Sequence, residues 1–74
     1  MSAFSNNLKE LRTSKKISQK QIASQLDIAD RQYRRYENEE QQPTLPIIIK
    51  LADYFNISID YLVGRTDNPD SHKS

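Results

Sequence analysis

The segment from Ile17 to Tyr36 carries two sets of helix-start signals close together, and no other part of the chain constrains the fold as strongly. Ser18 and Gln21 have the spacing of a capping box, in which the serine oxygen accepts from the amide three residues on and the glutamine side chain bonds back to the serine amide. Ile17 and Ile22 occupy the two positions of a hydrophobic staple, a contact that sets the direction in which the chain enters a helix. These signals predict a helix that begins directly after Ser18.

A second helix follows after a very short connection. Ile28 and Tyr33 repeat the staple spacing, and Ala29 stands in the cap position. Tyr33 and Tyr36 have the spacing of an inward face, which leaves the charged residues of this segment mostly outward. The first helix of the pair contributes an apolar stripe formed by Ile22, Ala23 and Leu26. A connection limited to residues 27–29 leaves room only for two helices at an angle, a helix-turn-helix unit.

The remaining segments predict three further helices, so the expected fold class is all-α with five short helices. A first helix is expected from about Ser5 to Lys15. The fourth is expected after a Thr44 cap, with an inward stripe of Leu45, Ile48, Leu51, Ala52 and Phe55. Asn56 suits the left-handed end of this helix, Ser58 caps a short fifth helix, and Gly64 stops it.

Length and composition predict one small domain without covalent cross-links. The chain has 74 residues, of which 1–66 are expected to form the domain and 67–74 a polar, disordered tail. The sequence contains no cysteine, which excludes disulfides and thiolate metal sites. It has no apolar run long enough for a membrane span or a secretory signal, so a cytoplasmic protein without membrane association is expected.

The charges are distributed unevenly along the chain. Residues 1–35 hold eight basic against three acidic residues, a net charge of +5, whereas residues 36–74 have a net charge of −4. The positive part includes Arg31, Arg34 and Arg35 on the second helix of the pair. An arginine fork can donate two hydrogen bonds to O6 and N7 of guanine in the major groove. The helix pair therefore predicts binding to double-stranded DNA.

The order of the motifs resembles the compact helix-turn-helix domain of lambdoid phage repressors and Cro proteins, the large repressor-like (XRE-type) family of bacterial and phage regulators. The resemblance is carried by LKELR at 8–12, ISQKQIASQL at 17–26, YEN at 36–38, PTL at 43–45 and KLADYFNISIDYLVGRT at 50–66. It implies a lambda-repressor-like fold in a transcriptional regulator, most often a repressor. Such a protein reads a near-palindromic operator with its third helix in the major groove.

The resemblance also assigns roles within the helix pair, with the recognition helix running from about Asp30 to Asn38. The residues expected at base edges are Asp30, Arg31, Gln32 and Arg35. The residues expected at phosphates are Ser18, Gln19, Lys20 and Arg34. Asp30 and Gln32 each have a structural alternative, Asp30 as a partner of the positive helix end and Gln32 as a capping partner. For Arg34 the alternatives to the phosphate contact are a solvated side chain and the reading of a base.

Two expectations outside the helix pair follow from the same resemblance. Arg12 and Glu37 are expected to form an inward ion pair that ties the first helix to the end of the third. The C-terminal helix region is expected to join two copies of the chain across a two-fold axis. Its possible dimer surface is drawn from Tyr54, Ile59, Tyr61 and Val63, for which plain core packing is the alternative.

The chain departs from the family's pattern at three places. Asp27 stands where relatives usually have glycine, in a turn that needs a left-handed residue. Ala29 replaces the usual serine or threonine cap of the recognition helix. Glu39 and Glu40 replace glycine and basic residues that grip the DNA backbone. The affinity of one monomer for DNA is therefore expected to be modest, which makes dimerisation more necessary.

Two other classes of function compete with DNA binding. A protein-interaction module of the same fold, like an antitoxin or a sporulation-type regulator, would suit the acidic loop and the net charge of only +1. An enzyme is the weakest alternative, because the single histidine, His72, lies in the polar tail and the single glycine cannot form a phosphate-binding loop. No catalytic residue, cofactor, metal ligand set or small-molecule site is expected from the sequence.

Overall fold

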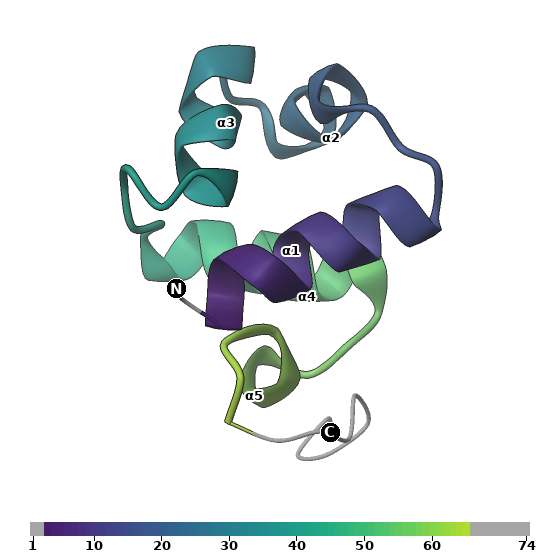
Figure 1. Ribbon diagram of the computed structural model, residues 1–74, viewed down its shortest axis with the longest axis vertical. Coiled ribbons are helices and arrows are strands. Elements are labelled where there is room, and N and C mark those ends of the chain that lie inside the picture. The colour runs from purple at the N-terminus through teal and green to yellow at the C-terminus, as the bar shows by residue number, and fades with distance from the viewer. Residues whose placement is uncertain (1–2, 66–74) are drawn as a thin grey trace.

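The computed structural model describes residues 3–65, and this part of the chain folds into five helices joined by short loops (Figure 1). They are α1 (Ala3–Ser14), α2 (Gln19–Leu26), α3 (Asp30–Glu37), α4 (Leu45–Phe55) and α5 (Ile59–Leu62). In Figure 1, α2 and α3 lie together at one end of the molecule, α1 and α4 cross its middle, and α5 lies at the opposite end. The predicted all-α fold with a central helix-turn-helix unit is confirmed.

One hydrophobic core joins these helices. Tyr33 and Tyr36 of α3 are fully buried, as their inward spacing predicts. The other buried apolar residues are Leu8, Ile22, Ala23, Leu26, Leu51, Ala52, Phe55, Ile57 and Leu62. Because α3 contributes two of the largest fully buried side chains, packing holds it firmly against α1 and α2.

The two ends of α2 have the conformations that the sequence predicts, and the start of α3 has its predicted cap residue. The amide of Gln21 donates to Ser18 Oγ over 3.0 Å, and the amide of Ser18 donates to the Gln21 side chain over 2.8 Å, so the capping box is confirmed. Asp27 ends α2 in the left-handed conformation, with φ 59° and ψ 44°. Ala29 is the N-cap of α3 and makes no side-chain capping bond. The start of α3 is therefore weaker than that of α2.

Replacing Ala29 by serine should raise the free energy of unfolding by about 1 kcal/mol. The backbone at Ala29 already has the extended conformation of a cap, with φ −72° and ψ 148°, so a hydroxyl there can accept from an amide in the first turn of α3. The urea midpoint, compared at equal m-value, measures the gain. Ala29→Val is the matched control, since it adds a side chain without an acceptor and should give no gain. A lower midpoint for the serine variant would contradict the observed start of α3.

The predicted range of the first helix is Ser5 to Lys15. α1 begins two residues earlier, at Ala3, and ends one residue earlier, at Ser14. Ser5, expected at the helix start, is buried within the helix instead. Its hydroxyl donates to the carbonyl oxygen of Tyr36 over 2.8 Å. A serine next to polar residues predicts a helix start, and the sequence alone cannot reveal a hydrogen-bond partner 31 residues away.

At the start of α4, one prediction is confirmed in position only and another is wrong. Thr44 occupies the N-cap position, but its side chain makes no capping hydrogen bond. A cap accepts from the second or third amide of the helix, and Pro46 at the second position has no N–H, which leaves the amide of the third residue as the one donor. The inward stripe predicts a buried Leu45, yet this residue is 62% exposed. Helical periodicity gives the direction of a side chain, but not whether another element reaches the first turn.

Gly64 follows α5 with a left-handed backbone, φ +86°, and lies against the start of α1. A Cβ at this position would lie 2.4 Å from the Cβ of Ala3, far closer than van der Waals contact. The predicted stop is therefore also a point of close approach between the two ends of the described chain.

The Gly64→Ala variant should lose about 1–2 kcal/mol of unfolding free energy from the left-handed conformation alone, and more from the clash with Ala3. Thermal unfolding measures the loss. The double variant Ala3→Gly/Gly64→Ala removes the clash but keeps the backbone cost, so it should recover only part of the stability. An unchanged melting temperature for Gly64→Ala would contradict the observed packing.

None of the helices within residues 3–65 is long and apolar enough to cross a membrane. The same residues contain no group of three or more His, Asp or Glu side chains that could hold a metal ion. The predicted polar tail, residues 67–74, which includes His72, lies outside the described residues. The expectations for that segment therefore stay predictions.

Candidate nucleic-acid interface

The outer surface of α3 carries three arginines. Arg31, Arg34 and Arg35 are all exposed, while the two buried tyrosines on the other face of the helix hold it in the core. Arg31 and Arg35 are one helical turn apart, so their side chains leave the same side of α3. None of the three forms an ion pair with an acidic residue within residues 3–65. Their guanidinium groups can therefore meet an external acceptor.

The first turn of α2 adds polar groups next to α3, against which α2 packs (Figure 1). Ser18 and Lys20 are exposed and Gln19 is half-buried. The capping box uses the amides of Ser18 and Gln21, which leaves the amides of Gln19 and Lys20 directed out of the positive end of the helix. Such an end is suited to an anion, phosphate included.

Asp30 and Gln32, the other two residues expected at base edges, are both half-buried. Asp30 lies in the first turn of α3, where its charge also favours the positive helix end. Gln32 Nε2 donates to the hydroxyl of Tyr36 over 2.8 Å, so the capping role considered for Gln32 is not what the structure shows. This bond uses one amide hydrogen and leaves the carbonyl oxygen and the second hydrogen to meet a base.

Beneath this surface, the Glu37 carboxylate collects hydrogen bonds from α1, α2 and α3. Arg12 approaches it with two nitrogens, Nε at 2.5 Å from Oε2 and Nη2 at 3.2 Å from Oε1. Gln19 Nε2 donates to Oε1 over 3.1 Å, and the Tyr33 hydroxyl donates to Oε2. Arg12 Nη1 also donates to the carbonyl oxygen of Ile17 over 2.9 Å. The predicted ion pair between Arg12 and Glu37 is therefore present and forms part of a larger network.

The network changes the proton affinities of its members. Burial pulls the pKa of the Glu37 carboxyl upward, but hydrogen bonds from Arg12, Tyr33 and Gln19 outweigh burial and leave this pKa below its ordinary value. Burial, followed by the hydrogen bond to Glu37, raises the pKa of the Tyr33 hydroxyl far above its ordinary value. The hydrogen bond to Glu37 raises the pKa of Arg12. At neutral pH the ion pair is thus fully charged and Tyr33 is a neutral donor.

The sequence suggested Arg12 and Glu37 but not the links to Gln19 and Tyr33. Tyr33 and Glu37 are four residues apart on one helix, a spacing that places them on the same side and could have been noticed. Gln19 belongs to another helix, 18 residues away, and nothing in its neighbours indicates that its amide reaches Glu37.

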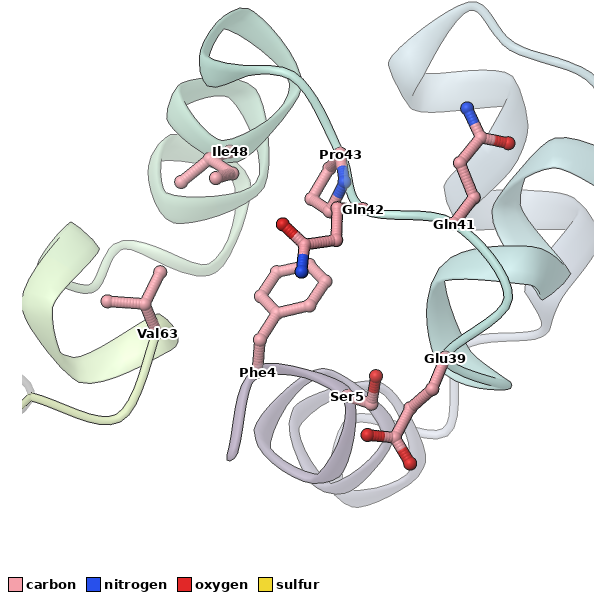
Figure 2. A pocket seen from close by; sticks show the side chains of 8 residues that line it. All are labelled: Phe4, Ser5, Glu39, Gln41, Gln42, Pro43, Ile48 and Val63. Atoms are coloured by element: carbon pink, nitrogen blue, oxygen red, sulfur yellow. The ribbon is translucent and has the colours of Figure 1, made fainter. Parts of the chain in front are cut away.

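We call the outer surface of α3 together with the first turn of α2 the α2–α3 surface. A surface pocket of about 310 Å³ lies away from it, between the start of α1, the loop after α3, and α4 and α5 (Figure 2). Figure 2 shows the side chain of Phe4 next to that of Gln42, with Ile48 and Val63 on the opposite side of the pocket. No residue of α2 or α3 lines it. The pocket is therefore not part of the candidate nucleic-acid interface.

The residues expected in a dimer surface are exposed to different degrees. Ile59 is 39% exposed and Tyr54 38%, whereas Tyr61 and Val63 are half-buried. Tyr54 lines a shallow hollow together with residues of α2, while the other three belong to α5 and its C-cap. Ile49 of α4 is also exposed, at 41%, and the sequence did not single it out.

Comparison with known proteins bears directly on the helix pair α2 and α3. A family model described as helix-turn-helix matches residues 8–62, most of the chain. The chain belongs to the helix-turn-helix family. The family predicted from the motif order is thereby confirmed.

Several relatives of this helix-turn-helix protein have names that state a role. It is 36% identical over 67 residues to the uncharacterized HTH-type transcriptional regulator YobD of Bacillus subtilis, covering 90% of this chain and 60% of that protein. It is 42% identical over 48 residues to the cryptic phage CTXphi transcriptional repressor RstR of Vibrio cholerae, covering 65% of this chain and 43% of that protein. A crystal structure of a transcriptional regulator from Listeria innocua superposes with a TM-score of 0.80 at 38% identity, covering 82% of this chain and 57% of that one. The chain thus spans about half the length of these relatives.

Proposed function

We propose that this helix-turn-helix protein is a sequence-specific, double-stranded DNA-binding regulator of transcription, acting as a repressor, with residues 1–66 as its DNA-binding domain. The observation that carries the proposal is the pair Arg31 and Arg35, exposed on one side of a helix whose opposite face is buried. A helix presented in this way can enter the major groove, where arginine forks read guanine. The names of YobD, a transcriptional regulator, and RstR, a transcriptional repressor, support the same role.

Each polar residue of the surface has a proposed contact. Asp30, Arg31, Gln32 and Arg35 read base edges, with Asp30 accepting from a cytosine amino group. Ser18, Gln19, Lys20 and Arg34 contact phosphates and set the position of α3 in the groove. The proposal includes no chemistry on the DNA, and it places the protein in the cytoplasm.

We also propose that two copies act together, joined through the C-terminal helix region. Ile59, the most exposed apolar residue of α5, would lie near the centre of the contact, with Tyr54, Tyr61 and Val63 around it. A two-fold dimer places the recognition helices about one DNA turn apart, roughly 34 Å, and requires a near-palindromic site.

Selection of bound duplexes from a random pool tests the proposal. We expect enrichment of one sequence with two-fold symmetry, containing guanines in each half-site. Titration of the selected duplex should then show log Kobs falling linearly with log[salt], by about 0.9 for each phosphate neutralised. A pool without an enriched sequence, or binding that salt does not weaken, would overturn the proposal and favour an interaction with protein instead.

A further inference from the structure

The Glu37 carboxylate lies at the junction of three helices and is completely occupied. Each of its oxygens accepts two hydrogen bonds: Oε1 from Arg12 and Gln19, and Oε2 from Arg12 and Tyr33. A carboxylate offers about four acceptor positions, so none is left over. Glu37 itself is only 4% exposed. Its charge is balanced inside the protein, because Arg12 stands against it with a two-nitrogen fork.

Gln19 is the only one of these partners that also belongs to the α2–α3 surface. Its Nε2 carries two hydrogens, and the bond to Glu37 Oε1 uses one of them. The second hydrogen is held at a defined angle, because an amide group is planar. In the same first turn, the backbone amides of Gln19 and Lys20 leave the positive end of α2. A glutamine side chain in solvent would instead lose up to about 2 kcal/mol of rotamer entropy when it binds.

We propose that Glu37 is a positioning residue for DNA binding, which acts through Gln19 by fixing its side-chain amide toward the phosphate that the first turn of α2 meets. This inference rests on the proposed function, since the phosphate contact of Gln19 is part of it. Glu37 itself stays out of contact with DNA, and the paired Arg12 prevents its negative charge from repelling the phosphate. The same carboxylate that joins the helices therefore also prepares one of the DNA contacts.

A double-mutant cycle on the selected duplex separates positioning from simple stability. Gln19→Met removes the amide at similar volume and should raise Kd about tenfold or more, the scale of a hydrogen bond to a charged group. The salt slope should not change, because a neutral amide releases no counterion. Glu37→Gln should also raise Kd in the wild-type background. In the Gln19→Met background it should raise Kd less than twofold, because the group through which it acts is gone.

Tyr33→Phe is the matched control. It removes another hydrogen bond to the same carboxylate, on Oε2, and leaves the Gln19 bond to Oε1 in place. It should lower stability but change Kd less than twofold. A Glu37→Gln effect that is equal in both backgrounds, or is matched by Tyr33→Phe at equal folded fraction, would overturn the inference.

Nitrogen-15 relaxation of the Gln19 side chain in the free protein tests the inference without DNA. The wild type and Tyr33→Phe should show a rigid amide, with an order parameter near 0.85. Glu37→Gln should show a mobile one below about 0.6, because its single oxygen cannot accept from Arg12, Gln19 and Tyr33 together. If Glu37→Gln does not fold, the wild-type value decides, because a mobile Gln19 amide in the folded protein would overturn the inference. Failure of the proposed function and failure of the inference give different results. If no duplex is enriched, the proposed function is overturned, whereas a mobile Gln19 amide overturns only the inference.

Discussion

Replacing Arg31 or Arg35 by alanine should abolish selective operator binding and leave the fold intact. Both side chains are exposed and neither contributes to the core, so the unfolding free energy should change by no more than about 0.5 kcal/mol. A bidentate contact with guanine contributes about 1–3 kcal/mol of discrimination, and a two-fold dimer loses it twice. The expected loss is about 2–6 kcal/mol, or roughly 30-fold to more than 10,000-fold in Kd. Electrophoretic retardation of the selected duplex against excess unrelated DNA measures it.

Arg34→Ala is the matched control for these two variants. Arg34 is exposed on the same helix, but its proposed contact is a phosphate, which carries no sequence information. Its loss should weaken binding to all duplexes alike and reduce the salt slope by about 0.9 per monomer. Selective retardation that survives in both Arg31→Ala and Arg35→Ala would contradict the assignment of α3 as the recognition helix.

Most of the fold could be predicted because its helix boundaries depend on local chemistry. The capping box at Ser18 and the left-handed residues Asp27 and Asn56 act on atoms within a few positions along the chain, and all three have the predicted conformation. The inward face of α3 follows from the spacing of its two tyrosines, which are both buried. Signals of this range can be read from a sequence without knowing what packs on it.

The errors arise in the first turns of α1 and α4. Ser5 bonds to the end of α3 from within α1, which begins at an earlier residue than the polarity of Ser5 suggests. Thr44 makes no side-chain capping bond, and Leu45, in the first turn of α4, is exposed. These outcomes depend on tertiary packing, which propensity and periodicity do not describe.

In the candidate interface, too, the sequence predicts the features that depend on local patterns and not those that depend on tertiary packing. The exposed arginines could be predicted, since an amphipathic helix with a buried tyrosine face presents most of its charges outward. The ion pair of Arg12 with Glu37 was expected only through the family resemblance. The bond from Gln19 to this pair could not be foreseen, because it depends on the crossing of α2 and α3 and on side-chain torsions.

Removing the Glu37 carboxylate should destabilise the fold more than any other single change to this network. In Glu37→Ala the guanidinium of Arg12, whose side chain is only 15% exposed, loses its partner, and the hydroxyl of Tyr33 loses its acceptor. Breaking a buried pair on one side costs about 3–5 kcal/mol. A domain of this size has roughly 4–11 kcal/mol in total, so the variant should lose about a third or more of its unfolding free energy. Circular dichroism with urea titration measures the loss, and Glu40→Ala, an exposed glutamate three residues on, should leave the midpoint unchanged.

The same pair makes stability depend on pH in a defined direction. The pKa of Glu37 is lower in the folded protein than in the unfolded chain, so its contribution is fully present above the unfolded value of about 4.3. That contribution is lost as the pH falls through the folded pKa. The pKa of Tyr33 is raised, so its contribution is present below about pH 10 and is lost as the pH rises above that value. The urea midpoint should therefore fall below pH 4 and again above pH 10. Tyr33→Phe should reduce only the fall of the midpoint above pH 10, and Glu37→Gln mainly the fall below pH 4. If the midpoint of Glu37→Gln falls below pH 4 as much as that of the wild type, other carboxylates control acid unfolding.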